Sequence, residues 1–117
     1  MDPIYDRQGK VVAWLKGKDI YHLNGKHAGV LHGENVHGHR GQHLGILKGG
    51  LFRDHRGGAV AFLPGASGGP ILPIPSIPPI PPIPSIPPIQ AIPSIPPIPA
   101  IPSLGWGSIT WEQFISL

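Results

Sequence analysis

IYDRQGKVVAWLKGKD (4–19), IYHLNGKHAGVLHGEN (20–35), VHGHRGQHLGILKGGL (36–51) and FRDHRGGAVAFLPGAS (52–67) are four consecutive sixteen-residue segments that align without a gap. Each segment opens on a large apolar residue, and each has glycine at its sixth and fourteenth positions and leucine at its twelfth. A repeat of this length indicates several copies of one supersecondary unit. The first half of the chain is therefore expected to be a symmetric assembly of four such units.

Each unit is too short for two helices, and its two glycine turns lie eight residues apart. This spacing predicts a β-hairpin with a short strand, a glycine turn and a longer strand, and Asn24-Gly25 is a favourable hairpin turn. Eight short strands avoid exposed edges when they close on themselves. We predict an all-β fold in which four 16-residue β-hairpin repeats close around a pseudo-four-fold axis. Small residues would allow close approach near that axis, namely Ala13, Gly29, Gly45 and Ala61.

The longer strands are apolar on both faces. Strict alternation places Val12 and Trp14 on one face and Ala13 and Leu15 on the other, and the same offsets hold in the other three units. A single-layer sheet of about 64 residues cannot bury both faces on itself. One face is therefore expected to be covered by the tail, by a partner subunit or by lipid. Because residues 4–67 contain all four units, we also expect this part of the chain to fold without the tail.

The second half of the chain repeats an isoleucine at every third position from 71 to 101, and proline fills most of the positions between. Proline confines the backbone to polyproline II, which has three residues per turn, so these isoleucines share one edge. The domains we predict are a β-hairpin domain (1–67), a polyproline II arm (68–105) and an aromatic C-terminal plug (106–117). The edge consists of Ile71, Ile74, Ile77, Ile80, Ile83, Ile86, Ile89, Ile92, Ile95, Ile98 and Ile101.

The extended arm is long compared with the β domain. The 33 residues from Ile71 to Ser103 would span about 100 Å at about 3.1 Å per residue, whereas a 67-residue domain has a diameter of about 28 Å. We therefore expect the arm to overshoot its own β domain and its isoleucine edge to pack against other subunits. Gln90-Ala91 interrupts the proline pattern and is the expected position of any bend.

The C-terminus has the signature of a short helix. Thr110 and Gln113 have the spacing of a capping box, and Ile109 and Phe114 have the spacing of a hydrophobic staple, so a helix is predicted to begin at Trp111. So short a helix needs a surface to dock on. The expected assembly contacts here are Trp106, Trp111 and Phe114.

The sixteen-residue period with its glycine and leucine positions resembles the four-fold β-flower family, small bacterial domains that form a shallow symmetric barrel. The resemblance covers residues 4–67 and implies no catalytic residues. The likeness of that family to the tubby C-terminal fold implies binding to lipid or to a membrane surface. The chain is expected to lack the central hydrophobic helix that tubby domains thread through the barrel.

The remaining motifs predict no catalytic residue, cofactor or metal. The seven histidines place His27 and His43, and likewise His39 and His55, at equivalent positions, but no cysteine joins them, and we expect solvated polar residues rather than a metal site. The string Gly65-Ala66-Ser67-Gly68-Gly69 leads into proline, so it lacks the helix that a hydrolase elbow requires. The net charge of +3 is ordinary, and no nucleic-acid partner is predicted.

We expect a structural protein that is not an enzyme and whose arm mediates homomeric assembly into an oligomer or filament. The alternative is a module that binds lipid or a membrane surface. The start of the chain has no apolar signal region. Cytoplasmic residence is the default expectation, and export by a dedicated machine remains open.

Overall fold

The computed structural model describes all 117 residues and forms one closed antiparallel barrel with a short helix. Each strand pairs with its neighbour in the chain, and β8 returns to pair with β1. The all-β prediction is confirmed. The elements are β1 (Asp2–Tyr5), β2 (Val11–Lys16), β3 (Asp19–His22), β4 (His27–His32), β5 (Asn35–His37), β6 (His43–Lys48), β7 (Leu51–Arg53), β8 (Ala59–Phe62) and α1 (Trp111–Ile115).

Four irregularities in strand register recur sixteen residues apart. In the first, Ile4 pairs with Ala13 but Tyr5 pairs with Val11, so Val12 is an extra residue. The same slip recurs between β3 and β4, β5 and β6, and β7 and β8. A bulge of this kind interrupts the alternation of side chains. The predicted faces were therefore partly wrong, because Val12, Ala28, Leu44 and Val60 join the inner cluster instead of the outer face.

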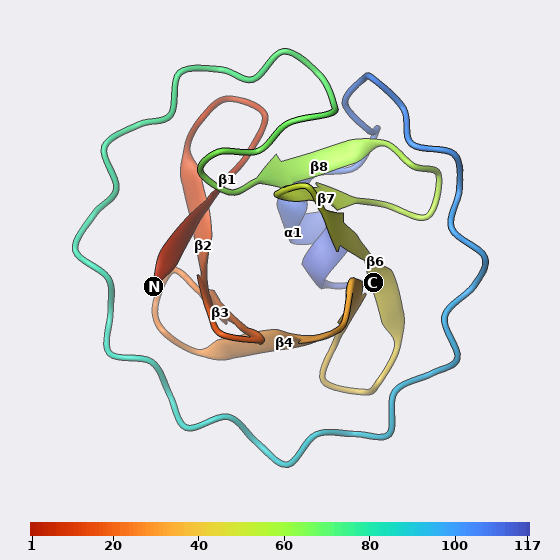
Figure 1. Ribbon diagram of the computed structural model, residues 1–117. Coiled ribbons are helices and arrows are strands. Elements are labelled where there is room, and N and C mark those ends of the chain that lie inside the picture. Colours follow the sequence, from red (N-terminus) through yellow and green to blue (C-terminus); the bar gives the residue numbers. More distant parts are fainter.

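Helix α1 fills the inside of the barrel, as Figure 1 shows in a view along the barrel axis. Trp111 and Phe114 are buried among residues from all four units, and the Phe52 and Trp111 rings lie 5.2 Å apart in an edge-to-face arrangement. The helix starts at Trp111 with the capping box of Thr110 and Gln113, as predicted. The expectation that the barrel lacks a central helix was wrong, because the helix comes from the far end of the chain.

The arm does not project from the barrel but runs once around it (Figure 1). Residues 71–103 form neither helix nor strand. Four serine N–H groups each donate to a turn glycine of one unit, at 2.7–3.0 Å: Ser76 to Gly9, Ser85 to Gly25, Ser94 to Gly41 and Ser103 to Gly57. The arm therefore advances nine residues for every sixteen residues of the barrel.

The expectation that the arm would overshoot its β domain was wrong, because it compared the length of the arm with the diameter of the domain instead of its circumference. The molecule measures 36 Å by 36 Å by 21 Å, and a circle of that diameter has a circumference of about 110 Å, close to the roughly 100 Å of an extended arm. The isoleucine arm thus fits one turn around the barrel. No single bend at Gln90-Ala91 is needed, since the path curves gradually along its whole length (Figure 1).

The turn glycines allow this close approach of the arm. Gly41 has a φ of +78°, which favours glycine, and a Cβ atom on it would collide with the carbonyl oxygen of Ile92. Gly9, Gly25 and Gly57 face the carbonyls of other arm isoleucines in the same way. The glycine at the sixth position of each unit therefore forms part of the hairpin turn and also contacts the backbone of the arm.

The barrel closes at the seam between β1 and β8, which is the shortest strand pairing, and the C-terminal segment lies beside this seam. The two strands share one residue pair, Tyr5 with Phe62. Ala59 donates to the carbonyl of Gly105 at 3.2 Å and accepts from Gly107 at 2.7 Å, so the segment around Trp106 runs parallel to β8. The guanidinium of Arg7 lies over the Trp106 ring and donates to the carbonyl of Gly107.

Candidate functional site: an isoleucine belt over two histidine pockets

The isoleucines form a belt around the outside of the molecule. All eleven are 90–100% exposed, although the arm backbone is bound to the barrel at four points. The reason is the period of three: the serine amides lie on the edge that faces the barrel, and the isoleucines lie on another edge. The structure therefore places the predicted edge residues in one exposed apolar row along the arm, which faces away from the barrel instead of into it.

The three aromatic residues that we assigned to assembly contacts have different surroundings. Trp106 is half-buried at the seam beside Phe62. Trp111 and Phe114 are 3% and 0% exposed inside the barrel of their own chain. These two cannot contact another subunit while α1 is docked, so the plug fills its own barrel, and among the residues predicted for assembly the isoleucines are the fully exposed ones.

Arg53 holds the two ends of the belt. Its side chain is buried, and it donates to the carbonyls of Gly57 and Ser103 at 2.7 Å and of Gly68 at 3.0 Å. Gly68 precedes the isoleucine run and Ser103 follows it, so one guanidinium closes the ring. No pattern in the repeats indicates this role, since the equivalent residues are Tyr5, Tyr21 and His37.

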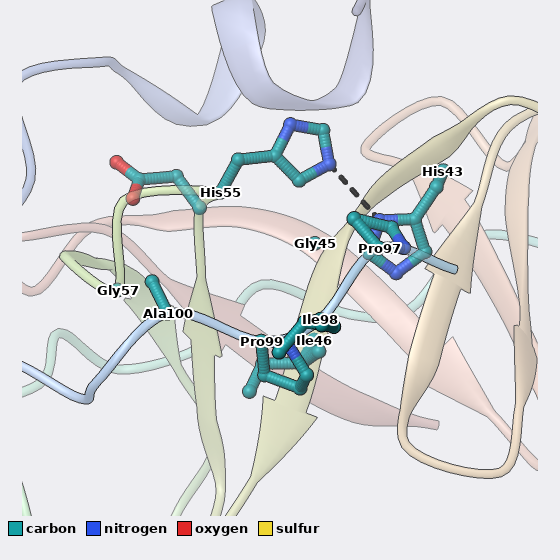
Figure 2. Close-up of a pocket in the computed structure, with 10 residues that line it drawn as sticks. His43, Gly45, Ile46, His55, Gly57, Pro97, Ile98, Pro99 and Ala100 are labelled. Atoms are coloured by element: carbon teal, nitrogen blue, oxygen red, sulfur yellow. Dashed lines mark hydrogen bonds between the residues drawn. The ribbon is translucent and has the colours of Figure 1, made fainter.

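Two pairs of histidines lie in pockets between the barrel and the belt. His27 Nδ1 is 2.9 Å from His39 Nε2, and His43 Nδ1 is 2.9 Å from His55 Nε2. One pocket lies under Pro88–Ala91 and the other under Pro97–Ala100, nine arm residues further on. Figure 2 shows the His43 and His55 rings facing each other beside Pro97. Sequence symmetry predicted the equivalence of these pairs but placed them in solvent, whereas His27 is buried.

Two more histidines line the pocket of the first pair. His37 is buried, and its Nε2 lies 3.2 Å from the carbonyl of Ser94 on the arm. His37 Nδ1 and His32 Nε2 are buried nitrogens without a hydrogen-bond partner. Unpartnered buried nitrogens are uncommon in folded proteins, so these two set the pocket apart from an ordinary core.

Burial shifts the titration of several of these imidazoles. The pKa of His39 is lowered mainly by desolvation and to a smaller extent by repulsion from His27 and His22. The pKa of His43 is lowered mainly by desolvation and to a smaller extent by repulsion from His55 and His37. The pKa values of His22 and His32 are lowered in the same way, with partial desolvation as the larger cause and repulsion from neighbouring basic residues as the smaller one.

We expect the midpoint of thermal unfolding to fall as the pH is lowered from 7.5 to 5.5. In the unfolded chain a histidine has a pKa of about 6.5, so the unfolded state takes up protons first. The neutral histidines therefore make their full contribution to the free energy of unfolding above about pH 6.5, and this contribution is lost as the pH falls toward their lower pKa values in the folded state. Calorimetry across this range measures the slope. Changing His22, His32, His39 and His43 to Asn should flatten it, and a midpoint that rises on acidification would contradict this explanation.

A nine-residue period in the arm was missed in the sequence although its signal was present. Ser76, Ser85, Ser94 and Ser103 are spaced by nine, and there are four of them for four barrel units. Proline has no N–H to donate, so a non-proline residue is required wherever the arm hydrogen-bonds to the barrel. Four serines in the arm and four units in the barrel together predict that the arm binds to the barrel once per unit.

A closed eight-stranded antiparallel barrel with four equivalent bulges and a central helix defines a small symmetric β-barrel protein. A family model described as 4-fold beta flower protein matches residues 2–115, and the chain belongs to this family. The match includes the arm and the helix, so it extends well beyond residues 4–67. Neither a curated protein nor a solved structure shows significant similarity to the chain. The only helix, α1, is too short to cross a membrane.

Proposed function

We propose that this protein is a structural, non-enzymatic component that assembles with copies of itself through its isoleucine belt. The observation that carries the proposal is the exposure of all eleven belt isoleucines at 90–100%. Monomeric proteins rarely leave continuous apolar patches larger than about 300–600 Å² uncovered. A belt that surrounds the whole molecule therefore requires an apolar partner.

Other copies of the chain suit this belt for two reasons. The belt is convex and closed, so a single partner of ordinary shape can cover only one arc of it, whereas several copies can surround it. The belt also contains no charged residue, since Glu112 is the only one after Arg56, so two belts meet without repulsion. Four equivalent attachments of the arm to the barrel divide the belt into similar arcs, which favours an extended array of discs touching at their rims.

The conformation of the arm supports such contacts. We infer that residues 71–103 adopt polyproline II, because the proline content, the three-residue period of exposure and the length of the path all agree with it. Burying one isoleucine side chain contributes roughly 1.5–3 kcal/mol. A contact that buries three from each partner would therefore contribute about 9–18 kcal/mol before the entropic costs of association.

Two belt variants test the proposal. Changing Ile80, Ile83, Ile86 and Ile89 to Ser removes four neighbouring side chains of the eleven in the belt and should reduce the size of the assembly. Changing every second isoleucine to Ser removes side chains from every arc and should leave a monomer. Sedimentation velocity measures the mass. The free energy of unfolding of the barrel should stay within about 0.5 kcal/mol of the parent's in both variants, because the side chains are exposed in the monomer.

The matched control changes Ser76 and Ser94 to Ala. These substitutions keep the backbone N–H donors and alter the arm away from the isoleucine edge, so the assembly should persist. Ser85 is left unchanged, because its Oγ accepts a hydrogen bond from the backbone of His27 at 3.0 Å. If the parent protein sediments as a monomer, the assembly proposal is wrong. Flotation of that monomer with liposomes, lost in the alternating variant, would support the lipid-binding alternative that the family resemblance implies.

A further inference from the structure

The histidine pairs occupy only two of the four equivalent places around the barrel. In the second unit the place holds Asp19, His27 and His39, and in the third it holds Asn35, His43 and His55. The sixteen-residue period puts Pro3, Val11 and Leu23 at the equivalent place in one remaining unit and Leu51, Ala59 and Arg7 in the other. The barrel therefore closes without imidazoles at this place, which indicates that the pairs have a role other than folding.

Each inner histidine is held in a defined tautomer. His27 Nε2 lies 2.8 Å from the carboxylate of Asp19, and His43 Nε2 lies 2.9 Å from the side-chain oxygen of Asn35. Both oxygens accept, so Nε2 carries the hydrogen and Nδ1 presents its lone pair to the outer histidine. An oxygen acceptor that fixes and orients an imidazole from behind is the arrangement that metal sites use for their histidine ligands.

We propose that each pair is a binding site for one divalent transition-metal ion, with Cu²⁺ and Ni²⁺ the ions that suit it best. The ligands are Nδ1 of the inner histidine and Nε2 of the outer one. Two nitrogens in neighbouring positions of a square-planar ion, each about 2.0–2.1 Å from it, are about 2.9 Å apart. The hydrogen-bonded nitrogens already have this separation in both pairs, and the rings need only pivot so that their lone pairs converge on the ion. For the ion to enter, the hydrogen on the outer Nε2 moves to Nδ1 of the same ring, and both facing nitrogens then offer lone pairs.

The surroundings of the pairs fit an open, exchangeable site. No three histidine or acidic side chains are placed to hold one ion together, so water completes the coordination of each. The pockets have cavity volumes of about 20 Å³ at His43 and His55 and about 10 Å³ at His27 and His39, room for about one small ion or water molecule. The outer ligands His39 and His55 are exposed, which gives an ion access beside the arm.

The two sites should differ in affinity because their supporting groups differ. Asp19 bears a negative charge that makes the imidazole behind it a stronger ligand, whereas Asn35 is neutral. Supporting groups of this kind typically change metal affinity by about 10–100-fold. The pair His27 and His39 is therefore the tighter site, and Asp19→Asn should bring its affinity down to that of the other pair without changing the number of ions bound.

Titration of the full-length protein with Cu²⁺ at pH 7.5, by calorimetry and electron paramagnetic resonance, tests the proposal. The parent should bind two ions per chain, each with two nitrogen ligands. His39→Ala should leave only the weaker site, His55→Ala only the tighter one, and the double variant neither. His22→Ala, which removes an exposed histidine outside the pairs, should still bind two ions.

The remaining outcomes are equally defined. Two ions bound by the double variant, or none bound by the parent, would overturn the assignment. Because His39 and His55 are exposed, alanine should leave the fold intact, which circular dichroism verifies. If the alanine variants lose structure, His39→Gln with His55→Gln preserves a donor at each outer position, and ion binding by that folded variant equal to the parent's would also overturn the proposal.

Discussion

Replacing Phe114 with alanine is expected to lower the free energy of unfolding by about 3–5 kcal/mol, as for other fully buried aromatic residues. Phe114 is 0% exposed and packs in the barrel interior with Trp111 and Phe52. Truncation would leave a cavity at the centre of the hydrophobic core inside the barrel, and α1 would lose most of its attachment. Urea unfolding followed by tryptophan fluorescence measures the change.

Glu112→Ala provides the control for this substitution, since it alters an exposed residue of the same short helix and should change stability by no more than about 0.5 kcal/mol. Equal stability of Phe114→Ala and the parent would show that the barrel interior does not depend on the helix. The structure also changes our expectation for a fragment ending at Ser67. That fragment lacks α1 and the belt, so we now expect it to lose cooperative unfolding.

Replacing Arg53 with alanine is expected to lower the free energy of unfolding by about 2–5 kcal/mol and to release both ends of the belt. The three carbonyls that now accept from Arg53 would lose a charged partner, and each such loss costs about 1.5–3 kcal/mol where the group stays buried. Release of the arm ends should expose some of these carbonyls to water and limit the total. Hydrogen exchange should accelerate at Ser103 and Ser76, whose amides attach the arm near its ends.

Two further variants separate the hydrogen bonds of Arg53 from its packing. Arg53→Tyr installs the residue that the first two units have at this position, Tyr5 and Tyr21, and should preserve the barrel while the belt ends exchange faster. Arg56→Ala changes an exposed neighbouring arginine and should leave both stability and exchange unaltered. Unchanged exchange in Arg53→Ala would show that the arm stays closed without this residue.

The barrel could be predicted from its repeat, but its side-chain faces could not. A period of sixteen with two glycines is enough to indicate four equivalent strand pairs, and a capping box is enough to start α1 at Trp111. The bulge that turns Val12 inward has no marker in the sequence, since Val11, Val12 and Ala13 are all apolar. Strict alternation therefore assigned one residue in each unit to the wrong face.

The candidate sites show the same division between local pattern and long-range placement. The three-residue period predicted that the isoleucines share an edge, but only the path of the arm decides whether that edge faces the barrel or the solvent. Repeat symmetry likewise related His27 to His43. It did not identify Asp19 as the partner of His27, because that contact depends on the pairing of β3 with β4.

The ratio of nine arm residues to sixteen barrel residues restricts how a chain of this kind can change in length. One residue inserted into the arm would move every later serine away from its glycine and turn the isoleucine edge by about 120°. Three inserted residues would restore the edge but leave the serines misplaced. Only a simultaneous gain of nine arm residues and one sixteen-residue unit keeps both patterns in step, so a five-unit protein of this architecture would need two coordinated duplications in separate parts of its gene.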